Sequence, residues 1–202
     1  MLYDFNRRQF AVGALVAIAS AARGVSPSLA QAMDPAARRI ESYYATLLPA
    51  VNAARGLGVA ERARRISSAV FGAFDIGTMT RLAVGPAWSR FSGSERSQTM
   101  EAFSKFIVAD YASRLGDYSG EGYKVDPTVE VRGGDQIVKT QLGSTTINYL
   151  VRGARIVDIY ANGTVSELAT RRAEFSSILA SNGGAEGLIT ELRQRTRQLL
   201  GG

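Results

Sequence analysis

In the middle of the chain the apolar residues change from a helical spacing to strict alternation with polar ones, and this change constrains the fold most. Four runs rich in β-branched and aromatic residues follow one another, at 123–132, 137–142, 146–151 and 156–160. Short connections such as Gly133-Gly134 and Gly143-Ser144 separate them, and a two-residue connection joins strands that run antiparallel. The sequence therefore predicts a four-stranded antiparallel meander.

Apolar residues at three- and four-residue steps flank the meander on both sides, which predicts helices. These segments cover 37–51, 59–74, 76–83, 100–115, 168–179 and 188–199. Pro49 is expected to kink or divide the first helix. Asp75 is expected to cap the third helix, and Ser92 with Glu95 forms a capping box for the fourth. The predicted fold class is α+β, in which a curved meander and the helices before and after it enclose an apolar cavity.

The first 32 residues have the pattern of a cleaved export signal. Arg7-Arg8 precede the apolar run 11–22, and Ala30-Gln31-Ala32 is a small-residue cleavage site. We therefore expect export to the periplasm and one domain over 33–202, and the paired arginines leave the twin-arginine and general secretion routes both open. Loss of one aspartate and three arginines with the signal would lower the formal net charge from +6 to +4. This charge suits anionic lipid surfaces and does not demand nucleic acid.

The absence of His and Cys restricts the chemistry that is open to this chain. Disulfides and thiolate metal sites are excluded, and the most common general base is missing. The sequence also contains no metal-ligand cluster, Gly-rich phosphate loop or nucleophile elbow. It accordingly predicts a protein that is not an enzyme, with no cofactor and no metal.

Three polar residues lie where an enzyme of this fold would need them. They are Asp110 in the fourth helix and Asn148 and Asp158 in the strands. Asp158 either faces the cavity as a base or sits on the solvated face of its strand, and alternation along a half-buried strand favours the solvated face. Asp110 is expected to lie in solvent beside the apolar stripe of its helix.

Other residues allow both a functional and a structural interpretation. The basic residues in and just before the second helix either meet lipid headgroups or form the solvated face of a helix, which is the more frequent case. They are Arg55, Arg62, Arg64 and Arg65. Trp88 and Phe91 either stack on a ligand or anchor the core. Arg81 either reaches a lipid headgroup or pairs with a carboxylate.

Three long blocks of the sequence resemble the MlaC family of periplasmic lipid-binding proteins, also called the toluene-tolerance family. They are FDIGTMTRLAVGPAW (Phe74–Trp88), FSKFIVADYASRL (Phe103–Leu115) and RIVDIYANGTVSELATRRAEFSSIL (Arg155–Leu179). With the meander between them, the resemblance covers nearly all of the expected mature chain. YSGEGYKV (Tyr118–Val125) and TVSELATRRAEF (Thr164–Phe175) are similar to the hopanoid-associated members called HpnM.

The resemblance implies a cone-like fold of the nuclear-transport-factor type around a lipid pocket. It implies a carrier that shuttles a phospholipid or a hopanoid between the inner and outer membranes. The implied partners are an inner-membrane lipid transporter complex of the ABC type and an outer-membrane lipoprotein complex.

Such a carrier needs apolar walls, and core and pocket residues look alike in sequence. Both interpretations therefore stay open for each predicted wall residue, and flexible Met79 would adapt to varied acyl chains. The predicted lipid-binding residues are Phe74, Ile76, Met79, Leu82, Ala83, Trp88, Phe103, Phe106, Ile107, Tyr111, Val138, Leu142, Ile147, Tyr149 and Val151. Arg81 is the predicted headgroup or rim residue.

Two other functions compete with the carrier. The first is an enzyme on the same cone-like fold with Asp158 as its base, which rests on fold analogy alone. The second is a transporter adaptor that carries no lipid.

Overall fold

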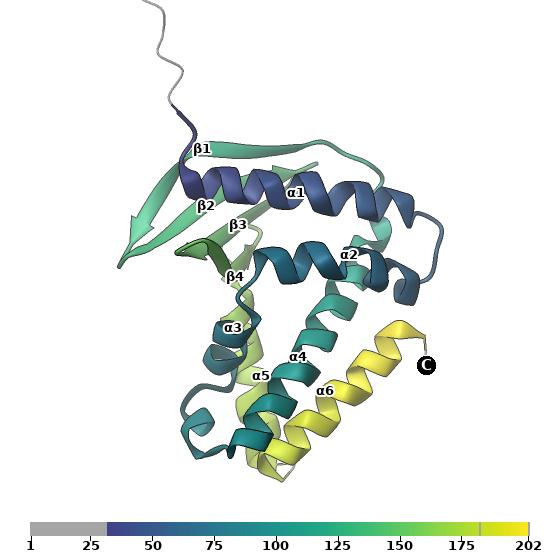
Figure 1. Cartoon of the computed structure of the whole chain (residues 1–202), viewed down its shortest axis with the longest axis vertical. Coiled ribbons are helices and arrows are strands. Elements are labelled where there is room, and N and C mark those ends of the chain that lie inside the picture. Colours follow the sequence, from purple (N-terminus) through teal and green to yellow (C-terminus); the bar gives the residue numbers. More distant parts are fainter. Residues whose placement is uncertain (1–31, 182, 202) are drawn as a thin grey trace, which may run out of the picture. The chain divides into compact units, whose positions relative to one another are not determined.

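Six helices, five strands and two short 3-10 turns make up the described part of the chain, residues 32–181 and 183–201 of the computed structural model (Figure 1). The helices are α1 (Pro35–Ala53), α2 (Val59–Ala73), α3 (Ile76–Val84), α4 (Gly93–Arg114), α5 (Glu167–Ser181) and α6 (Gly184–Leu200), and the 3-10 turns are η1 (Gly85–Arg90) and η2 (Leu115–Asp117). The strands are β1 (Tyr123–Arg132), β2 (Asp135–Leu142), β3 (Thr145–Arg152), β4 (Arg155–Ala161) and β5 (Val165–Ser166). Except for Ala32, the predicted export signal lies outside the described residues.

The strands form one antiparallel sheet in the order β1-β2-β3-β4-β5, which confirms the predicted α+β meander. The prediction of four strands was wrong by one, because the chain does not pass directly from β4 into a helix. Asn162 and Gly163 both have positive φ and turn the chain back. Val165 and Ser166 then pair with Ala161 and Tyr160 before α5 begins.

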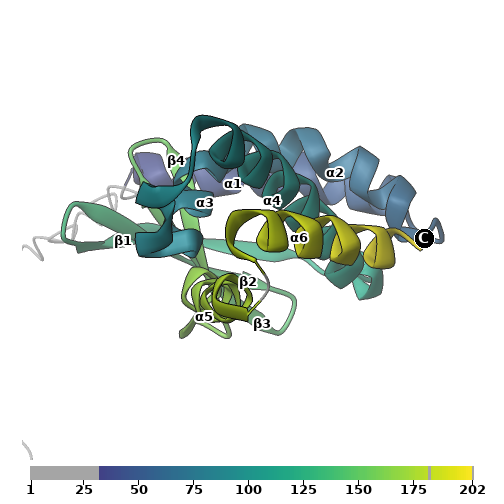
Figure 2. The ribbon, with the colours of Figure 1, turned by 90° about the horizontal axis from the view of Figure 1, so that it is seen from below.

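The helices are arranged around one face and one edge of this sheet. α1 packs against β1 and β2, and α2 lies between α1 and α4 (Figure 1). Figure 2 shows that α6 lies beside α4 and separates α2 from α5. α5 follows β5 directly and contacts β4, so the last two helices are joined to the sheet through its far edge.

Pro49 does not divide α1, which continues to Ala53. The missing N–H of this proline leaves the carbonyl of Ala45 without its helical donor. Both Ala45 and Pro49 are exposed, so water can satisfy that carbonyl. The neighbouring side chains of Leu48 and Val51 are buried and hold the helix in place on both sides of the proline.

The segment Phe74–Trp88 connects the helices to the sheet. Phe74 forms an isolated bridge with Ile156 of β4, and the Asp75 amide donates to the Ile156 carbonyl at 2.9 Å. The Asp75 side chain accepts from the Thr78 amide at 2.9 Å, which confirms the predicted cap of α3. Gly85 ends α3 at φ 67°, where an added Cβ would also approach the Arg172 guanidinium to 3.0 Å.

The basic run of α2 has two different environments. Arg64 and Arg65 are exposed and pair with Glu61, as expected for the solvated face of a helix. Arg62 is buried, which corrects that expectation for this residue. Its guanidinium donates to the Ala112 carbonyl at 2.7 Å and to the Leu57 carbonyl at 3.1 Å. It therefore joins the start of α2 to the last turn of α4.

Candidate functional site

An apolar pocket of about 300 Å³ opens between α1, the C-terminal end of α4 and the face of the sheet that α1 covers. Its wall consists mainly of aromatic and aliphatic side chains, and charged groups stand at one end. The lining residues are Tyr43, Tyr44, Leu47, Tyr111, Arg114, Leu115, Leu142, Thr145, Ile147, Tyr149, Ile159, Ala161, Asn162 and Glu167. Pockets of this size and lining are typical of sites for small apolar ligands.

The strand register places the sheet side chains of the pocket. Tyr149 lies opposite Val138 on β2 and opposite Ile159 on β4, and directly opposed residues share a face of the sheet. Ile147 lies opposite Thr140 and shares that face. All five residues that the sequence proposed as sheet walls lie on this face: Val138, Leu142, Ile147, Tyr149 and Val151.

A chain of hydroxyl groups ties α1 to the sheet behind the pocket wall. The Tyr149 hydroxyl donates to the Tyr44 hydroxyl at 2.9 Å, and Tyr44 lies 3.0 Å from the Thr140 hydroxyl. Thr140 in turn donates to the Ile147 carbonyl. Each of these buried oxygens is therefore satisfied, and the rings of Tyr44 and Tyr149 pack edge to face with centroids 5.9 Å apart.

Charged residues from α4 and α5 meet at the polar end of the pocket. Arg171 donates to Asp110 at 2.8 Å and lies 3.5 Å from Glu167. Arg114, which is half exposed, reaches Asp110 at 2.8 Å and Glu167 at 3.3 Å. The Tyr111 hydroxyl donates to the other Glu167 oxygen at 3.1 Å. Asp110 is thus held between two arginines, which corrects the expectation that it lies free in solvent.

Burial and charge pairing act in opposite directions on the pKa values of Glu167 and Arg171. Burial raises the pKa of Glu167 above its ordinary value, and the positive charges of Arg114 and Arg171 only partly oppose this effect. Arg171 is buried as well, which by itself would lower its pKa, but it faces Asp110, Glu167 and Glu174, so its pKa is raised. The Arg171 cation also lies over the Phe106 ring, 4.9 Å from its centroid.

Replacement of Glu167 by Gln is expected to change how stability depends on pH. Because the folded protein retains the Glu167 proton where the unfolded chain has lost it, this group contributes stability at acid pH that is lost as pH rises above 4.5. Relative to Glu167→Gln, the free energy of unfolding of the wild type should therefore fall between about pH 4 and pH 7. Urea denaturation across this range measures the difference.

Asp135→Asn serves as a control of opposite sign for that experiment. Two hydrogen bonds from Arg152, both at 2.7 Å, lower the pKa of Asp135, so its contribution is present at neutral pH and lost as pH falls. The wild type should therefore gain stability relative to Asp135→Asn as pH rises through the acid range up to about pH 4, so the denaturation series is extended down to about pH 2. If the free energy of unfolding of the wild type changed with pH in the same direction relative to both variants, the raised pKa of Glu167 would be contradicted.

Asp158 is buried, but it faces neither the pocket nor solvent, which corrects both readings of this residue. It lies opposite Leu150, on the face of the sheet turned away from Tyr149. Its carboxylate accepts from the amides of Ile159 at 2.8 Å and Leu168 at 3.0 Å and from the Ser166 hydroxyl at 2.6 Å. These donors place Asp158 at the N-terminus of α5, where a carboxylate stabilises a helix.

Asn148, the other polar residue singled out in the strands, also points away from the pocket. Its side-chain amide donates to the Gly163 carbonyl at 3.0 Å and supports the turn after β4. Neither strand residue therefore adds a reactive group to the pocket.

Four of the predicted lipid-binding residues line the pocket, namely Tyr111, Leu142, Ile147 and Tyr149. The other eleven lie elsewhere in the buried or half-buried core: Phe74, Ile76, Met79, Leu82, Ala83, Trp88, Phe103, Phe106, Ile107, Val138 and Val151. Trp88 packs on Phe91, with centroids 5.8 Å apart, and Arg81 is exposed on α3. Whether these residues contact lipid stays a prediction.

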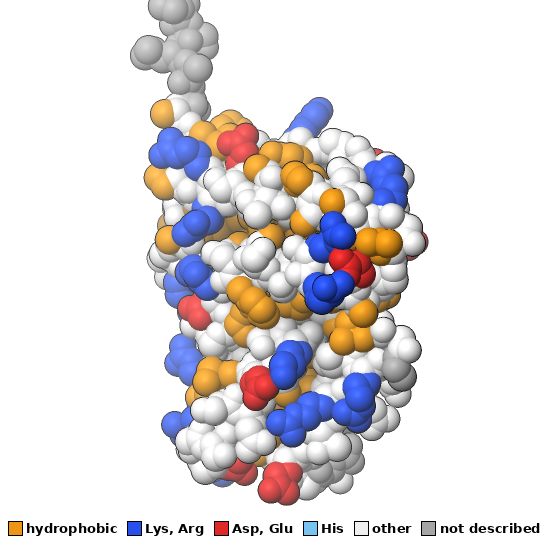
Figure 3. Space-filling model, turned by 45° about the vertical axis from the view of Figure 1, so that its right-hand side comes forward, with side chains coloured by type: hydrophobic (Ala, Val, Ile, Leu, Met, Phe, Trp, Pro, Cys, Tyr) orange, Lys and Arg blue, Asp and Glu red, His pale blue; other side chains and the backbone are white. Residues whose placement is uncertain are grey.

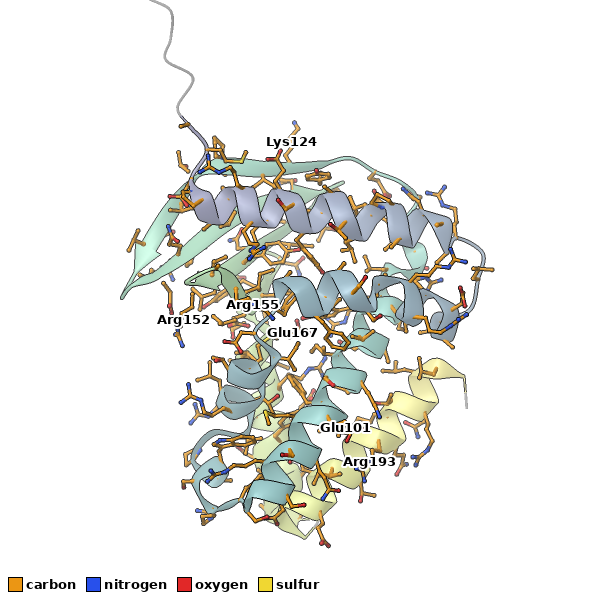
Figure 4. The ribbon with its side chains drawn as sticks, viewed as in Figure 1. Glu101, Lys124, Arg152, Arg155, Glu167 and Arg193 are labelled. Carbon is orange, nitrogen blue, oxygen red and sulfur yellow. The ribbon has the colours of Figure 1, made fainter. Side chains whose placement is uncertain are left out.

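No residue of α1 was predicted to line the pocket. Tyr43, Tyr44 and Leu47 face the sheet, and only the apolar stripe of their helix signalled that they are buried. Glu167 and Arg114 were missed because each looks in sequence like an ordinary charged residue on a helix. Figure 4 shows Glu167 in the middle of the molecule, between the sheet and α4, whereas Arg152 and Arg155 lie at the end of the sheet.

Two properties of the described residues bear on the kind of site. Within residues 32–181 and 183–201, no cluster of three or more acidic side chains has the arrangement of a metal site. None of the helices described there is both long and apolar enough to cross a bilayer.

The sequence and the fold are both similar to those of known proteins. The family described as MlaC protein matches residues 44–194. A solved structure of a phospholipid-binding protein from Ralstonia solanacearum, in complex with a phospholipid, has the same fold, with a TM-score of 0.71 at 18% identity. That match covers 81% of this chain and 98% of the other. No curated protein matches the chain.

Proposed function

The chain belongs to the MlaC family, and from this premise we propose that it binds a membrane phospholipid in the pocket between α1, α4 and the sheet. The observation that carries the proposal is the lining of that pocket, in which aromatic and aliphatic side chains form the wall and charged groups gather at one end. A phospholipid has the same division into an apolar and a charged part.

Acyl chains carried through water must be enclosed, because the hydrophobic free energy of exposing them is large. Each methylene buried away from water is worth about 0.8 kcal/mol, so two long acyl chains represent about 20 kcal/mol of hydrophobic free energy. One leaflet of a bilayer is about 15 Å thick in its hydrocarbon part, which gives the length of chain to be covered. The pocket of about 300 Å³ is small for two such chains. Cargo binding therefore requires α1 or α4 to move away from the sheet.

The charged end of the pocket suits the headgroup. Arg114 is 54% exposed, so its guanidinium stands where the pocket meets solvent. A guanidinium binds phosphate oxygens in the same way as the carboxylate oxygens that it contacts here. In this arrangement the phosphate stays in water and only the acyl chains are enclosed.

We extend the proposal to a carrier that works in the periplasm between the inner and outer membranes. The predicted export signal and the modest positive charge support it. Figure 3 shows Lys and Arg side chains spread over one face with fewer acidic ones among them, and such a surface is attracted to anionic membranes and acidic partners. An inner-membrane lipid transporter complex and an outer-membrane lipoprotein complex are the proposed partners, and a hopanoid is the alternative cargo.

Organic extraction of the purified mature protein, followed by lipid mass spectrometry, tests the proposal. We expect about one phospholipid per chain after purification from a native cell envelope. One hopanoid per chain would instead support the HpnM branch. Protein that carries no lipid and binds none from phospholipid vesicles would contradict the proposed function and favour an adaptor.

A further inference from the structure

Four tyrosines line the pocket, so its wall carries more hydroxyl groups than acyl chains alone require. They are Tyr43, Tyr44, Tyr111 and Tyr149. Three of the hydroxyls are used within the protein, since Tyr149 donates to Tyr44, Tyr44 lies 3.0 Å from the Thr140 hydroxyl, and Tyr111 donates to Glu167. The fourth is different.

Tyr43 is buried, with 6% of its surface exposed, but its hydroxyl makes no hydrogen bond to any described residue. The fully enclosed side-chain atoms that lack a partner, among the described residues, are Oδ1 of Asn148 and Nε of Arg171. The Tyr43 hydroxyl is not among them, so it still borders open space. It is therefore a donor on a buried side chain with open space beside it.

The apolar pocket, of about 300 Å³, is the larger of two hollows that Tyr43 borders, and the other has about 190 Å³. The smaller hollow is a shallow crevice between α1 and α2. Tyr44 and Tyr149, whose rings lie 5.8 and 6.0 Å from the Tyr43 ring, line the same pocket as Tyr43, and so do Tyr111 and Glu167.

Entry of a lipid changes the surroundings of this hydroxyl. Water satisfies it while the pocket is wet, whereas acyl chains that displace the water would leave the donor buried and unpaired. A cargo is therefore favoured if it carries an acceptor just inside the headgroup. The ester carbonyls of a glycerolipid occupy that position, between the phosphate and the apolar chains.

We propose that Tyr43 recognises the ester linkage of the cargo by donating a hydrogen bond to an ester carbonyl oxygen. This inference rests on the proposed function and adds a specificity to it. A diacyl phospholipid satisfies the hydroxyl, whereas a dialkyl phospholipid with the same headgroup offers only ether oxygens, which are weaker acceptors. The pocket should then prefer the ester lipid.

Competition between two lipids in one sample tests the preference. The full mature chain is loaded from vesicles that contain equal amounts of diacyl and dialkyl phosphatidylglycerol of the same chain length, and the bound ratio is read by mass spectrometry. A single neutral hydrogen bond predicts an ester preference of about five-fold for the wild type. Tyr43→Phe, which keeps the ring, should bind the two lipids about equally because it lacks the donor.

Tyr160→Phe is the matched control, because it removes a hydroxyl from β4 that does not line the pocket, and it should keep the wild-type ratio. Equal binding of both lipids by the wild type, or an unchanged preference in Tyr43→Phe, would overturn the assignment of Tyr43 alone. Failure of the wild type to bind either lipid would overturn the proposed function itself.

An infrared measurement tests the same hydrogen bond if Tyr43→Phe is poorly stable. The folded fraction of Tyr43→Phe is isolated, and the ester carbonyls of the diacyl lipid are labelled with ¹³C. The infrared carbonyl band of the bound lipid should then lie at lower wavenumber in the wild type than in Tyr43→Phe. An identical band in both proteins would overturn the inference.

Discussion

Replacement of Ile147 by Trp is expected to lower phospholipid affinity about 100-fold, because the indole would occupy space that the acyl chains need. Ile147 is half-buried on β3 and lines the pocket. If the larger side chain displaces about four methylenes of the cargo, the loss is about 3 kcal/mol at about 0.8 kcal/mol each. Transfer of fluorescent phospholipid from vesicles to the protein measures the affinity.

Val165→Trp is the matched control for this experiment. Val165 lies on β5, is 54% exposed and does not line the pocket, so the same new side chain there should leave the affinity unchanged. Thermal unfolding of both variants shows whether Ile147→Trp is folded. A folded Ile147→Trp protein that binds lipid as well as the wild type would mean that the cargo lies elsewhere.

Replacement of Asp158 by Ala is expected to lower the free energy of unfolding by about 3 kcal/mol, because it leaves several buried donors without an acceptor. Those donors are the amides of Ile159 and Leu168 and the hydroxyl of Ser166. Ser166 also accepts from the Ala169 amide at 2.9 Å, so the loss should spread through the first turn of α5. Urea denaturation gives the free energy, and hydrogen exchange at Leu168 and Ala169 locates the loss.

A second variant, Asp158→Asn, distinguishes a structural role of Asp158 from a catalytic one. If Asp158 were the base of an enzyme, Asp158→Asn would abolish turnover and leave the fold intact, whereas we expect both substitutions to destabilise the protein. Asp126→Ala is the control, since Asp126 accepts only from Thr128 on exposed β1 and should cost less than about 1 kcal/mol. A stable Asp158→Ala protein would contradict the role of Asp158 as the anchor of α5.

Local patterns predicted the elements of this fold well. The Ser92–Glu95 capping box begins α4, and the Asp75 cap begins α3. The strand boundaries follow the predicted alternation to within a few residues. The errors came where tertiary contacts override a local rule, since buried neighbours hold α1 together across Pro49, and β5 forms only because β4 offers an edge to pair with.

The pocket was predicted less well than the fold. Alternation along a strand shows which side chains share a face but not which face is covered, and here α1 covers the face of Tyr149 and leaves that of Asp158 to α5. The long apolar block Phe74–Trp88 was expected to line the cavity. It lies in the junction between helices and sheet, where Phe74 packs between Tyr43 and Tyr111, and its contact with lipid stays a prediction.

The sequence by itself determined the fold class, the order of its elements and the resemblance to a family, because all three depend on short-range periodicity and on motifs that are contiguous in the chain. Only the tertiary structure decided which apolar residues enclose the pocket. It alone brought Glu167 to Tyr111 and Arg171 to Asp110, separated by 56 and 61 positions in the chain. The physical reason is that burial and pairing are properties of the packed chain, and the hydrophobic effect that drives packing has no direction of its own.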